Sequence, residues 1–487
     1  MDSVSIDQKQ PRNHNKNEIF HQPTITIISI VLLSLALGIF IAMQQYLLVG
    51  LVFGLVIALL SALNIKIGIY LFYISVFIPV TYVERYFIDL PTSLRWFPQL
   101  FLGLLLVLSI LLKKNKITKD YPLLPNSMMW VGIIYLLLVL FSMLINFTSF
   151  LAAVWSLRGF ILIYGSIIVH RLNFTKKGQE KFIRFLVIIG LIMVPVTLFQ
   201  RVVIVASRPY QPSVYDMVTG LFASYDDLVL FQIFCVIAVT SWWIHGRKLL
   251  PFSPIILIGA LFFPLVISYS KAAPIYFFVT MIFVFWLCRT RISPKLLAAL
   301  FVIVIFGILG TIFFDVLFQA TGGPYSIVED LYTVEGALKY LLNENATTEG
   351  GLQRGAALLF NLELIQQEPH GLLIGLGPGS FSSSRIEGAT GYIYAMYPNL
   401  YLDFSSLTTM LGELGVSGVL ITIVFLISIY FLRKPMEGNH LIVLRKGSIF
   451  LLISLLFYGP YLLFPLTALI LGLISITGDL DEYITSP

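Results

Sequence analysis

Charged residues are scarce in this chain of 487 residues. Lys, Arg, Asp and Glu together make up 11% of the sequence, whereas roughly 25% is usual for a soluble domain. Hydrophobic residues make up 58%, and a core of ordinary size beneath a charged surface cannot enclose so many. This composition excludes a soluble globular protein and predicts a membrane protein.

Cysteine is also nearly absent. The chain has two, Cys235 and Cys288, and both lie within long apolar runs. A disulfide framework in the polar segments is therefore excluded, and so is a metal site built from several thiolates.

The apolar runs are continuous, and they predict an all-α polytopic membrane protein with about 13 (12–14) transmembrane helices. The last run contains Gly459, Pro460 and Pro465, so it forms either one kinked helix or a hairpin of two. The predicted spans are approximately 24–42, 46–62, 67–83, 96–112, 127–146, 150–169, 181–206, 228–244, 250–268, 272–288, 296–314, 408–432 and 447–474.

Basic residues gather in alternate loops between these spans. With residues 1–23 as a cytoplasmic tail, the loops on the same side hold Lys66 and the clusters at 113–119, 171–184, 247–248, 289–295 and 433–446. The opposite short loops carry only Arg85, Arg95, Arg208 and Lys271. Short cytoplasmic loops are enriched in Lys and Arg. We therefore expect transmembrane helices 1–11 in 24–315, a large extracytoplasmic loop in 316–407, and the C-terminal transmembrane helices with a short tail in 408–487.

The predicted outer loop is patterned. Apolar residues recur with helical spacing in 326–342 and again in 352–367. Pro369 ends the second helix, because the residue before a proline is disfavoured in the helical conformation. A Gly-rich run follows at 375–381, and then come three serines and a tyrosine-rich stretch. We expect this segment to form an ordered cap on the membrane domain.

Several of these features occur in the order of a known family. Arg354 opens the second amphipathic helix, the run GLGPGSF occupies 375–381, and a helix that re-enters the membrane begins with GELGVSG at 412–418. In this order and spacing the chain resembles the superfamily of O-antigen ligases and Wzy-type polysaccharide polymerases, bacterial membrane glycosyltransferases of the type C fold. Most of the chain, 24–474, takes part in the resemblance. Arg158, the pair Gln200-Arg201 and the run 268–271 resemble further family positions.

The resemblance implies an enzyme that transfers a glycan from a polyprenyl-diphosphate-linked donor to an acceptor glycan or lipid, on the outer face of the bacterial cytoplasmic (inner) membrane. It implies no cofactor. Membrane lipids and chain-length regulator proteins are the other implied partners. Nucleic acid is not among them, since basic loops beside anionic lipid account for the net charge of +6. Ligases of this family usually carry a His shortly before the Glu of the re-entry helix, where this chain has Asp403 to Ser406. This difference favours a polymerase over a ligase.

Such a transfer needs fixed positive charge, because negative charge grows on the leaving diphosphate. Arg suits this task, since its fork pairs two phosphate oxygens and stays charged. Arg354 and Arg158 are therefore candidate catalytic residues, and Asp403, Glu413 and His370 are candidates for the general base that the acceptor hydroxyl requires. The predicted outer face lacks a carboxylate cluster or a His-rich site, so a metal-independent reaction fits better. The candidates for substrate binding are Lys271, Arg201, Arg208, Gly375, Gly377 and Gly379.

Each candidate also has a structural interpretation. Arg354 is by default a solvated helix residue. Burying Arg158 in a span costs about 3 kcal/mol on insertion scales, so it needs a partner, which is either functional or structural. Lys271 and Arg201 lie near the predicted membrane–water interfaces, where long basic side chains commonly extend to lipid phosphates. The Gly run is either a phosphate cradle or a turn that crosses tightly over helices. Glu413 orients a helix and His370 holds the loop in this interpretation.

Two other classes of function stay open. A lipid-linked oligosaccharide flippase or another polysaccharide-export transporter also has many spans and buried cations, but transporters commonly show repeated sets of spans with short loops. A non-catalytic scaffold seldom keeps a charge such as Arg158 within a span. The sequence shows no convincing internal repeat and one long outer loop, and both features favour the glycan transferase.

Overall fold

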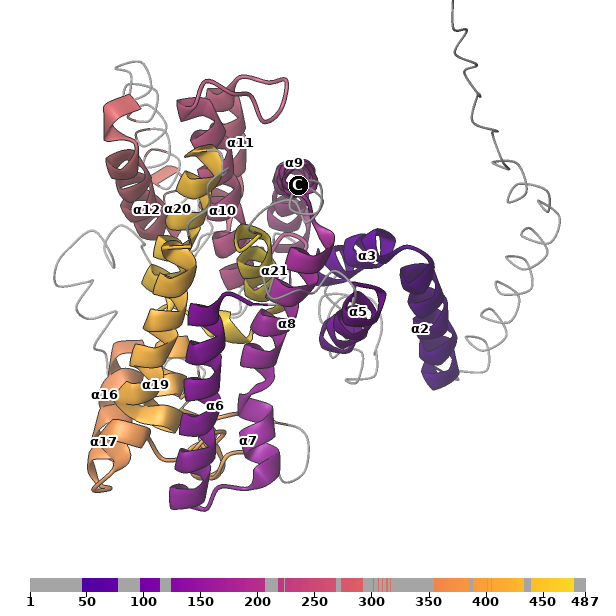
Figure 1. Cartoon of the computed structure of the whole chain (residues 1–487). Coiled ribbons are helices and arrows are strands. Elements are labelled where there is room, and N and C mark those ends of the chain that lie inside the picture. Colours follow the sequence, from indigo (N-terminus) through magenta and orange to yellow (C-terminus); the bar gives the residue numbers. More distant parts are fainter. Residues whose placement is uncertain are drawn as a thin grey trace, which may run out of the picture. The chain divides into compact units, whose positions relative to one another are not determined.

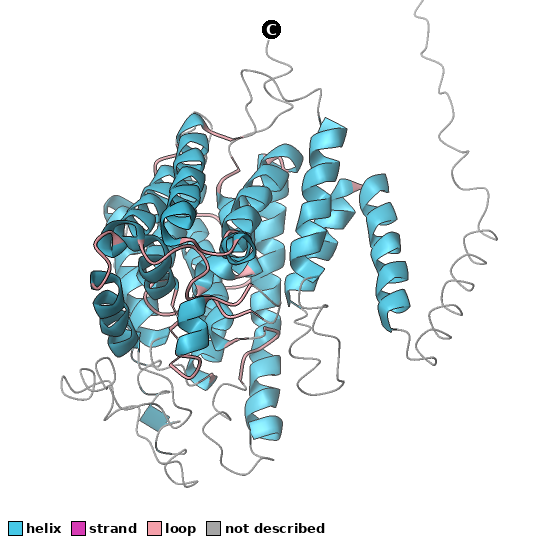
Figure 2. Cartoon of the chain, turned by 90° about the horizontal axis from the view of Figure 1, so that it is seen from below, coloured by secondary structure: helices cyan, strands magenta, loops and turns pink. Residues whose placement is uncertain are grey.

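The computed structural model describes residues 46–77, 97–113, 124–205, 218–222, 224–268, 273–291, 354–384, 389–400, 402–403, 405–432 and 439–476, with single residues at 301, 305, 309, 312, 313 and 316. Every regular element in these ranges is a helix (Figure 2). The predicted spans 24–42 and most of 296–314, and the predicted helix 326–342, lie outside the described residues.

The chain divides into two compact units, 1–64 and 65–487. The described helix of the first unit is α2 (Tyr46–Leu63). The second unit contains α3 (Ile65–Phe77), α5 (Phe97–Lys113), α6 (Asn126–Asn146), α7 (Phe150–Ser156), α8 (Arg158–Asn173), α9 (Lys176–Phe199), the π-helix η3 (Gln200–Val205), α10 (Tyr225–Ile244), α11 (Pro254–Ile267), α12 (Ala273–Leu287), the short η5 (Arg289–Arg291), α16 (Arg354–Gln366), α17 (Gly371–Ile374), α18 (Tyr392–Met396), α19 (Ser406–Tyr430), α20 (Asn439–Leu455), η6 (Tyr461–Leu463) and α21 (Pro465–Ile474).

Four described helices are long and apolar enough to cross a membrane: α6, α9 with its extension into η3, α10 and α19. The pair α7 and α8 adds a fifth candidate, with a bend of 44° between its two parts. Shorter apolar helices include α3, α5, α11, α12 and α21. The all-helical prediction is confirmed for the described residues. The count of about thirteen spans is not confirmed by these helices and stays a prediction.

Two predicted spans contain breaks in the structure, and the break differs from the prediction only in the first. The expected single helix at 150–169 is broken at Leu157 into α7 and α8. Trp155, just before the break, donates from Nε1 to the carbonyl of Ser383 in the loop described below. The run 447–474, left open between one helix and two, forms α20 and α21 with the short η6 between them. Pro460 and Pro465 separate the two helices, because proline lacks the N–H that a helix interior requires.

A second break lies inside α19. Gly415 has φ 65° and ψ −164°, so the helical hydrogen bonds are interrupted there. Carbonyls just before such a break lose their partners one turn ahead. Leu376 N donates to Gly412 O at 2.8 Å, and Gly377 N donates to Glu413 O at 3.1 Å. The Gly-rich run therefore docks on the break and satisfies the backbone groups that the break releases.

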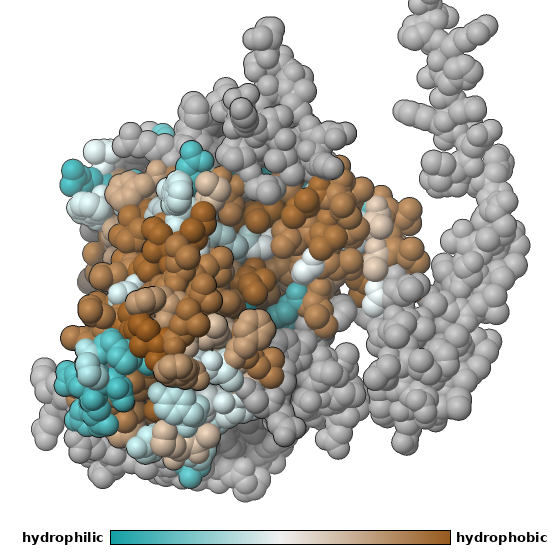
Figure 3. All heavy atoms as spheres, turned by 60° about the horizontal axis from the view of Figure 1, so that its bottom comes forward, coloured by the Kyte–Doolittle hydropathy of each residue, from teal (hydrophilic) through white to brown (hydrophobic). Residues whose placement is uncertain are grey.

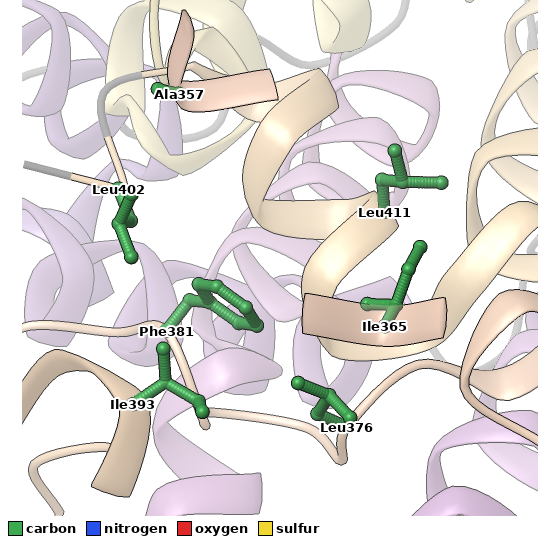
Figure 4. Packing of buried hydrophobic residues seen from close by; sticks show 7 residues of the cluster. All are labelled: Ala357, Ile365, Leu376, Phe381, Ile393, Leu402 and Leu411. Carbon is green, nitrogen blue, oxygen red and sulfur yellow. The ribbon is translucent and has the colours of Figure 1, made fainter. Parts of the chain in front are cut away.

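Part of the predicted outer loop folds into a cap beside the first half of α19. Helices α16 and α17 pack on α19 in Figure 1. Figure 4 shows the apolar cluster that this packing encloses, in which Phe381 is fully buried and Ile365 and Leu411 come from α16 and α19. The other members are Ala357, Leu376, Ile393 and Leu402. The described part of this segment thus has helices and an apolar cluster of its own, and a large extracytoplasmic loop over 316–407 stays a prediction.

Apolar side chains also cover much of the outer surface. Trp130, Leu137 and Leu144 of α6 are exposed, as are Leu420 and Val424 of α19. Figure 3 shows broad apolar areas over the described atoms on one face, with hydrophilic residues gathered near an edge. In water such a surface would drive aggregation, whereas lipid covers it without cost.

The helices α9, α10 and α20 share one polar end. Glu180 of α9 lies 3.2 Å from His440 Nε2 of α20 and 3.9 Å from Arg247 Nη1, which follows α10. At its other end α10 begins with Tyr225, whose hydroxyl accepts a hydrogen bond from Arg354. Arg247 and the start of α9, from two of the loops predicted to be cytoplasmic, thus lie at the opposite end of α10 from the cap residue Arg354.

Candidate functional site

Glu413 is the most heavily bonded carboxylate at the junction of cap and helices. The residue is 3% exposed. Ser156 Oγ at the end of α7 donates to Oε2 at 2.5 Å, and Ser382 Oγ after the Gly run donates to Oε1 at 2.7 Å. The backbone N–H groups of Gly379 and Phe381 donate to the same carboxylate. With four donors, Glu413 ties α7, the Gly run and α19 together.

Asp403 lies just before α19 and is half-buried. Ser383 Oγ donates to its Oδ2 at 2.8 Å, while the carbonyl of Ser383 accepts a 3.1 Å hydrogen bond from Trp155 Nε1. Burial raises the pKa of Asp403, and this effect outweighs the Ser383 hydrogen bond and the positive charge of Arg158, which both lower it. The backbone N–H groups of Ser383 and Asp403 also donate to this carboxylate, so it has three donors, one fewer than Glu413. A carboxylate with a raised pKa is a better proton acceptor than one with the ordinary value.

Arg158 is the first residue of α8, directly after the break. Its Cζ lies 4.2 Å from the centroid of the Trp155 ring, which is a cation–π geometry. The guanidinium interacts electrostatically with Glu413 and, less strongly, with Asp403. Among the described residues no carboxylate oxygen lies within 4.0 Å of it. Its charge is thus balanced by two nearby acids without a direct ion pair.

A cavity of about 80 Å³ lies next to this cluster, between α6, α8, α19 and η6. Three aromatic rings line it: Tyr135 stacks on Phe160 with centroids 4.7 Å apart, and the tilted ring of Tyr164 follows at 4.3 Å from Phe160. Glu413, Ser156 and Ser382 are among its polar lining residues. The cavity is large enough for several water molecules or for a small part of a ligand.

The three glycines proposed for phosphate binding have a tight packing role. Gly375, Gly377 and Gly379 have φ of 70°, 102° and 80°, a region that side chains disfavour. A Cβ at Gly375 would lie 2.3 Å from the carbonyl carbon of Glu413. The N–H groups of Gly377 and Gly379 already donate to Glu413, through its carbonyl and its carboxylate. This geometry favours the turn that crosses over helices rather than the phosphate cradle.

His370 holds the start of the Gly run to α6. Its Nε2 donates to Asn146 Oδ1 at 3.0 Å. The amide of Asn146 in turn donates to Ser142 O at 2.9 Å and to Gly375 O at 3.3 Å. These bonds favour the structural interpretation of His370, as a loop residue, over that of a general base.

Arg354 is not the solvated helix residue that its default interpretation expects. It begins α16, and its Nη2 donates to Tyr225 OH at 3.0 Å. Its Nε donates to the carbonyl of Tyr458, and its Cζ lies 4.3 Å from the centroid of the Tyr458 ring. Arg354 therefore belongs to a second cluster with α10 and the connection between α20 and α21.

The remaining candidates fall outside both clusters or outside the described residues. Arg201 lies in the π-helix η3. Its neighbour Gln200 is buried and makes paired bonds with Gly220, from Nε2 to the carbonyl at 2.6 Å and from the backbone N–H to Oε1 at 2.9 Å. Lys271 and Arg208 lie outside the described residues.

The structure thus brings Arg158, Asp403 and Glu413 together, and it adds residues that the sequence did not single out. Trp155, Ser156 and Ser383 contact this cluster directly. A tryptophan and a serine just before a charge within a span are a weak signal, because such residues also occur by chance. Their role depends on the break between α7 and α8.

Comparison with models of known protein families finds no match, and comparison with curated proteins finds none either. Within the described ranges, no group of three or more His, Cys, Asp and Glu side chains is placed to hold a metal ion.

Proposed function

We propose that this chain is a membrane glycosyltransferase that moves a glycan from a polyprenyl-diphosphate-linked donor to an acceptor glycan, as a polysaccharide or O-antigen polymerase does. The observation that carries the proposal is the Arg158 guanidinium, which lies beside Asp403 and Glu413 at a helix break without a direct ion pair to either among the described residues. A fixed cation inside an apolar helix array is costly and is a functional candidate by default.

In the proposed reaction the bond between the anomeric carbon of the sugar and the diphosphate oxygen breaks, and a bond to the acceptor oxygen forms. The electron pair of the broken bond stays on the polyprenyl diphosphate. Arg158 stabilises that charge, in the way that fixed donors stabilise an oxyanion. The acceptor hydroxyl loses its proton to Asp403, whose raised pKa suits a proton acceptor.

Glu413 has a different role in this proposal. Four hydrogen-bond donors occupy its carboxylate, so a substrate proton would have to displace one of them. We infer that Glu413 fixes the positions of Ser156 and Ser382, which line the cavity with it, while Asp403 takes part in the chemistry. Asp403 has one donor fewer than Glu413 and is more exposed, so an acceptor hydroxyl reaches it more easily.

The proposal includes the topology expected from the sequence: about thirteen spans, with 316–407 on the outer side of the bacterial cytoplasmic membrane. One observation supports it. Arg247, just after the C-terminal end of α10, lies near Glu180 of α9, whereas Arg354 bonds to Tyr225 at the N-terminal end of α10. A polyprenyl-linked donor on the outer face would meet the cap and the Arg158 cluster at the membrane surface.

The test is glycan transfer by the purified chain in detergent, with a lipid-linked oligosaccharide as donor and a metal chelator present. We expect longer glycans and free polyprenyl diphosphate. Arg158→Gln should lower the rate by about a hundredfold, the effect of losing one oxyanion-type donor, and Arg158→Lys should lower it less. Arg184→Gln, which removes an exposed arginine of α9, should leave the rate unchanged.

Two results would overturn the proposal. Full transfer by Arg158→Gln would remove its central residue. Movement of the intact donor across proteoliposome membranes, without any transfer, would identify a flippase instead. A requirement for added metal would overturn the metal-independent mechanism.

A further inference from the structure

The short cap helix α17 presents two large apolar side chains to its surroundings. Leu372 is 46% exposed and Leu373 is 64% exposed. A few residues earlier in the chain the exposed side chains are polar instead, at Gln366, Gln367 and Glu368. A single exposed leucine is ordinary on any protein surface. This pair is informative, because the exposed surface changes from polar to apolar within a few residues.

Hydrogen bonds to α6 fix the level of α17 along that helix (Figure 1). Ser142 Oγ donates to Ile374 O at 2.8 Å, and the Asn146 amide donates to Gly375 O at 3.3 Å. Asn146 is the last residue of α6, so Ser142 lies about 6 Å inside that end of the helix. Helix α6 has 21 residues and is therefore about 30 Å long, which equals the thickness of the hydrocarbon layer. The end of α17 thus lies beside the last turn of a full-length span.

The apolar surface of α6 extends to this same level. Phe141 is 56% exposed and Leu144 is 61% exposed, and α6 contains no charged residue. Exposed apolar side chains on a helix of this length fit lipid rather than water. The leucines of α17 therefore border a surface that lipid already covers.

On its other side α17 packs against a sharp turn inside α19. Thr422 Oγ1 donates to Met410 Sδ at 3.1 Å, whereas a straight helix would separate these two residues by about 18 Å. Gly415 therefore folds α19 back on itself. A Cβ on Gly415 would lie 2.5 Å from the carbonyl carbon of Leu373, so the backbone of α17 touches this turn. The next residue, Val416, is 36% exposed, and it continues the apolar surface on this side.

Irregular backbone is tolerated at membrane depth only where its polar groups have partners other than water. The carbonyls of Ile374 and Gly375 accept from the side chains of α6. The N–H groups of Leu376 and Gly377 donate to carbonyls of α19 just before its turn. The protein thus satisfies these groups by itself, and the side chains that remain exposed on α17 are leucines.

We propose that α17 is an insertion of the cap into the hydrocarbon layer of the membrane, in which Leu372 and Leu373 lie among lipid acyl chains. The partner is lipid, because the leucines continue the exposed apolar surfaces of α6 and α19 at the same level. The inference goes beyond the proposed function and does not depend on it, since it requires only that α6 spans the membrane. The Gly run begins at Gly375, directly after α17, so the insertion also fixes the depth of the Glu413 cluster in the membrane.

The first test measures what surrounds the two leucines. A nitroxide spin label is attached to single introduced cysteines in the full chain, which is reconstituted in phosphatidylcholine nanodiscs. Labels at Leu373→Cys and Leu372→Cys should collide more often with oxygen, which concentrates in hydrocarbon, than with a water-soluble nickel chelate. Glu368→Cys, in the exposed polar stretch, should show the reverse preference. Leu137→Cys, at a position of α6 that is 59% exposed, supplies the reference for lipid. The native cysteines are buried, so they should take up little label.

Two results would overturn the inference. Access of the nickel chelate to both leucine positions, as high as at Glu368→Cys, would place α17 in water. Labels that neither oxygen nor the chelate reaches would mean that protein, such as a second copy of the chain, covers the leucines. The melting temperature of each labelled variant is compared with that of the native chain, and Leu372→Cys alone carries the test if Leu373→Cys does not fold.

The second test measures depth. A fluorophore replaces the spin label, and the bilayer contains lipids with a nitroxide quencher either near the glycerol or near the end of the acyl chain. The fluorophore at Leu373→Cys should be quenched more by the shallow nitroxide. Leu137→Cys lies about 14 Å from the end of α6, near the middle of the hydrocarbon layer, and should be quenched more by the deep one. Stronger quenching of Leu373→Cys by the deep nitroxide, or none by either, would contradict the level given by the bonds to α6. Neither test involves glycan transfer, so the inference and the proposed function can fail separately.

Discussion

The hydroxyl of Ser382 donates a 2.7 Å hydrogen bond to Oε1 of Glu413. The two residues lie on opposite sides of the junction between the cap and the broken helix α19. The loop that carries Ser382 also supplies the backbone donors for the carbonyls released at Gly415. A break in a membrane helix and the segment that repairs it are thus parts of one arrangement, with a buried carboxylate at its centre.

That arrangement should depend strongly on the Glu413 carboxylate. Glu413→Ala leaves two hydroxyls and two backbone N–H groups without their acceptor, so the free energy of unfolding should fall by about 3 kcal/mol or more. Glu413→Gln keeps one acceptor oxygen and should cost less. Thermal unfolding in detergent measures both, with Glu363→Gln on the exposed face of α16 as a neutral control. A native melting temperature for Glu413→Ala would show that the four bonds are not essential to the fold.

The sequence predicts the long helices well and their breaks poorly. The bounds of α5, α6 and α10 follow from apolar runs that end at polar or charged residues. The break at Leu157 has no proline beside it, and Gly159, two residues later, is only a weak signal. The break depends on partners such as Glu413, far along the chain, which accepts from Ser156. Local patterns do not contain such tertiary bonds, so they predict a single span.

The Gly run offers a test of how much its close crossing contributes. At Gly246, where φ is 69° and an added Cβ would have nothing within 4 Å of it, alanine should cost about 1 kcal/mol from strain alone. At Gly375, φ 70° and ψ −168° lie in a region that essentially only glycine adopts, and a Cβ would lie 2.3 Å from the carbonyl carbon of Glu413. Alanine there should cost about 2 to 3 kcal/mol beyond the loss at Gly246, from the greater strain and because the neighbouring backbone must move. Unfolding of the two variants in parallel measures the difference. Similar losses at both positions would mean that the close crossing does not matter.

The sequence predicts the candidate site in part. Arg158 stands out in the sequence because it is a charge within a predicted span. Asp403 lies where the ligases of the resembled family usually carry a His, and Glu413 lies at the position of that family's Glu. The structure brings the three residues together. Trp155 and Ser383 carry no such signal in the sequence. Their importance comes from tertiary hydrogen bonds: Trp155 Nε1 donates to the carbonyl of Ser383, and the hydroxyl of Ser383 donates to Asp403. His370 stands out as a titratable loop residue, and its bond to Asn146 accounts for it structurally.

The proposed orientation predicts which cysteines a membrane-impermeant thiol reagent reaches. Glu368→Cys in the cap should react in intact spheroplasts, whereas Lys177→Cys near the start of α9 should react only after lysis. Both positions are accessible to solvent, and the two native cysteines are buried, so the background should be low. The opposite pattern would place the cap on the cytoplasmic side and remove the argument for a donor on the outer face.

Asp403 should give the transfer reaction a characteristic pH dependence. Burial raises its pKa above the usual 3.8, and only the ionised carboxylate accepts a proton. The rate should therefore rise with pH through the raised pKa and then level off. Stability follows the opposite direction: the folded chain holds this proton more tightly than the unfolded chain, so the contribution of Asp403 to the free energy of unfolding decreases as pH rises from the unfolded to the folded pKa.

Ser383→Ala is the sharpest variant for this assignment. The Ser383 hydroxyl donates to Asp403 Oδ2 and lowers its pKa, so its removal should move the acidic limb of the rate profile to higher pH without abolishing transfer at the plateau. Ser380→Ala, in the same loop, removes a buried hydroxyl that has no hydrogen-bond partner in the described structure and should leave the limb in place. Asp403→Asn should remove the limb together with most of the rate. Transfer assays across the pH range, with the folded fraction of each variant measured in parallel, decide the matter: a limb that stays fixed in Ser383→Ala means that another group takes the proton.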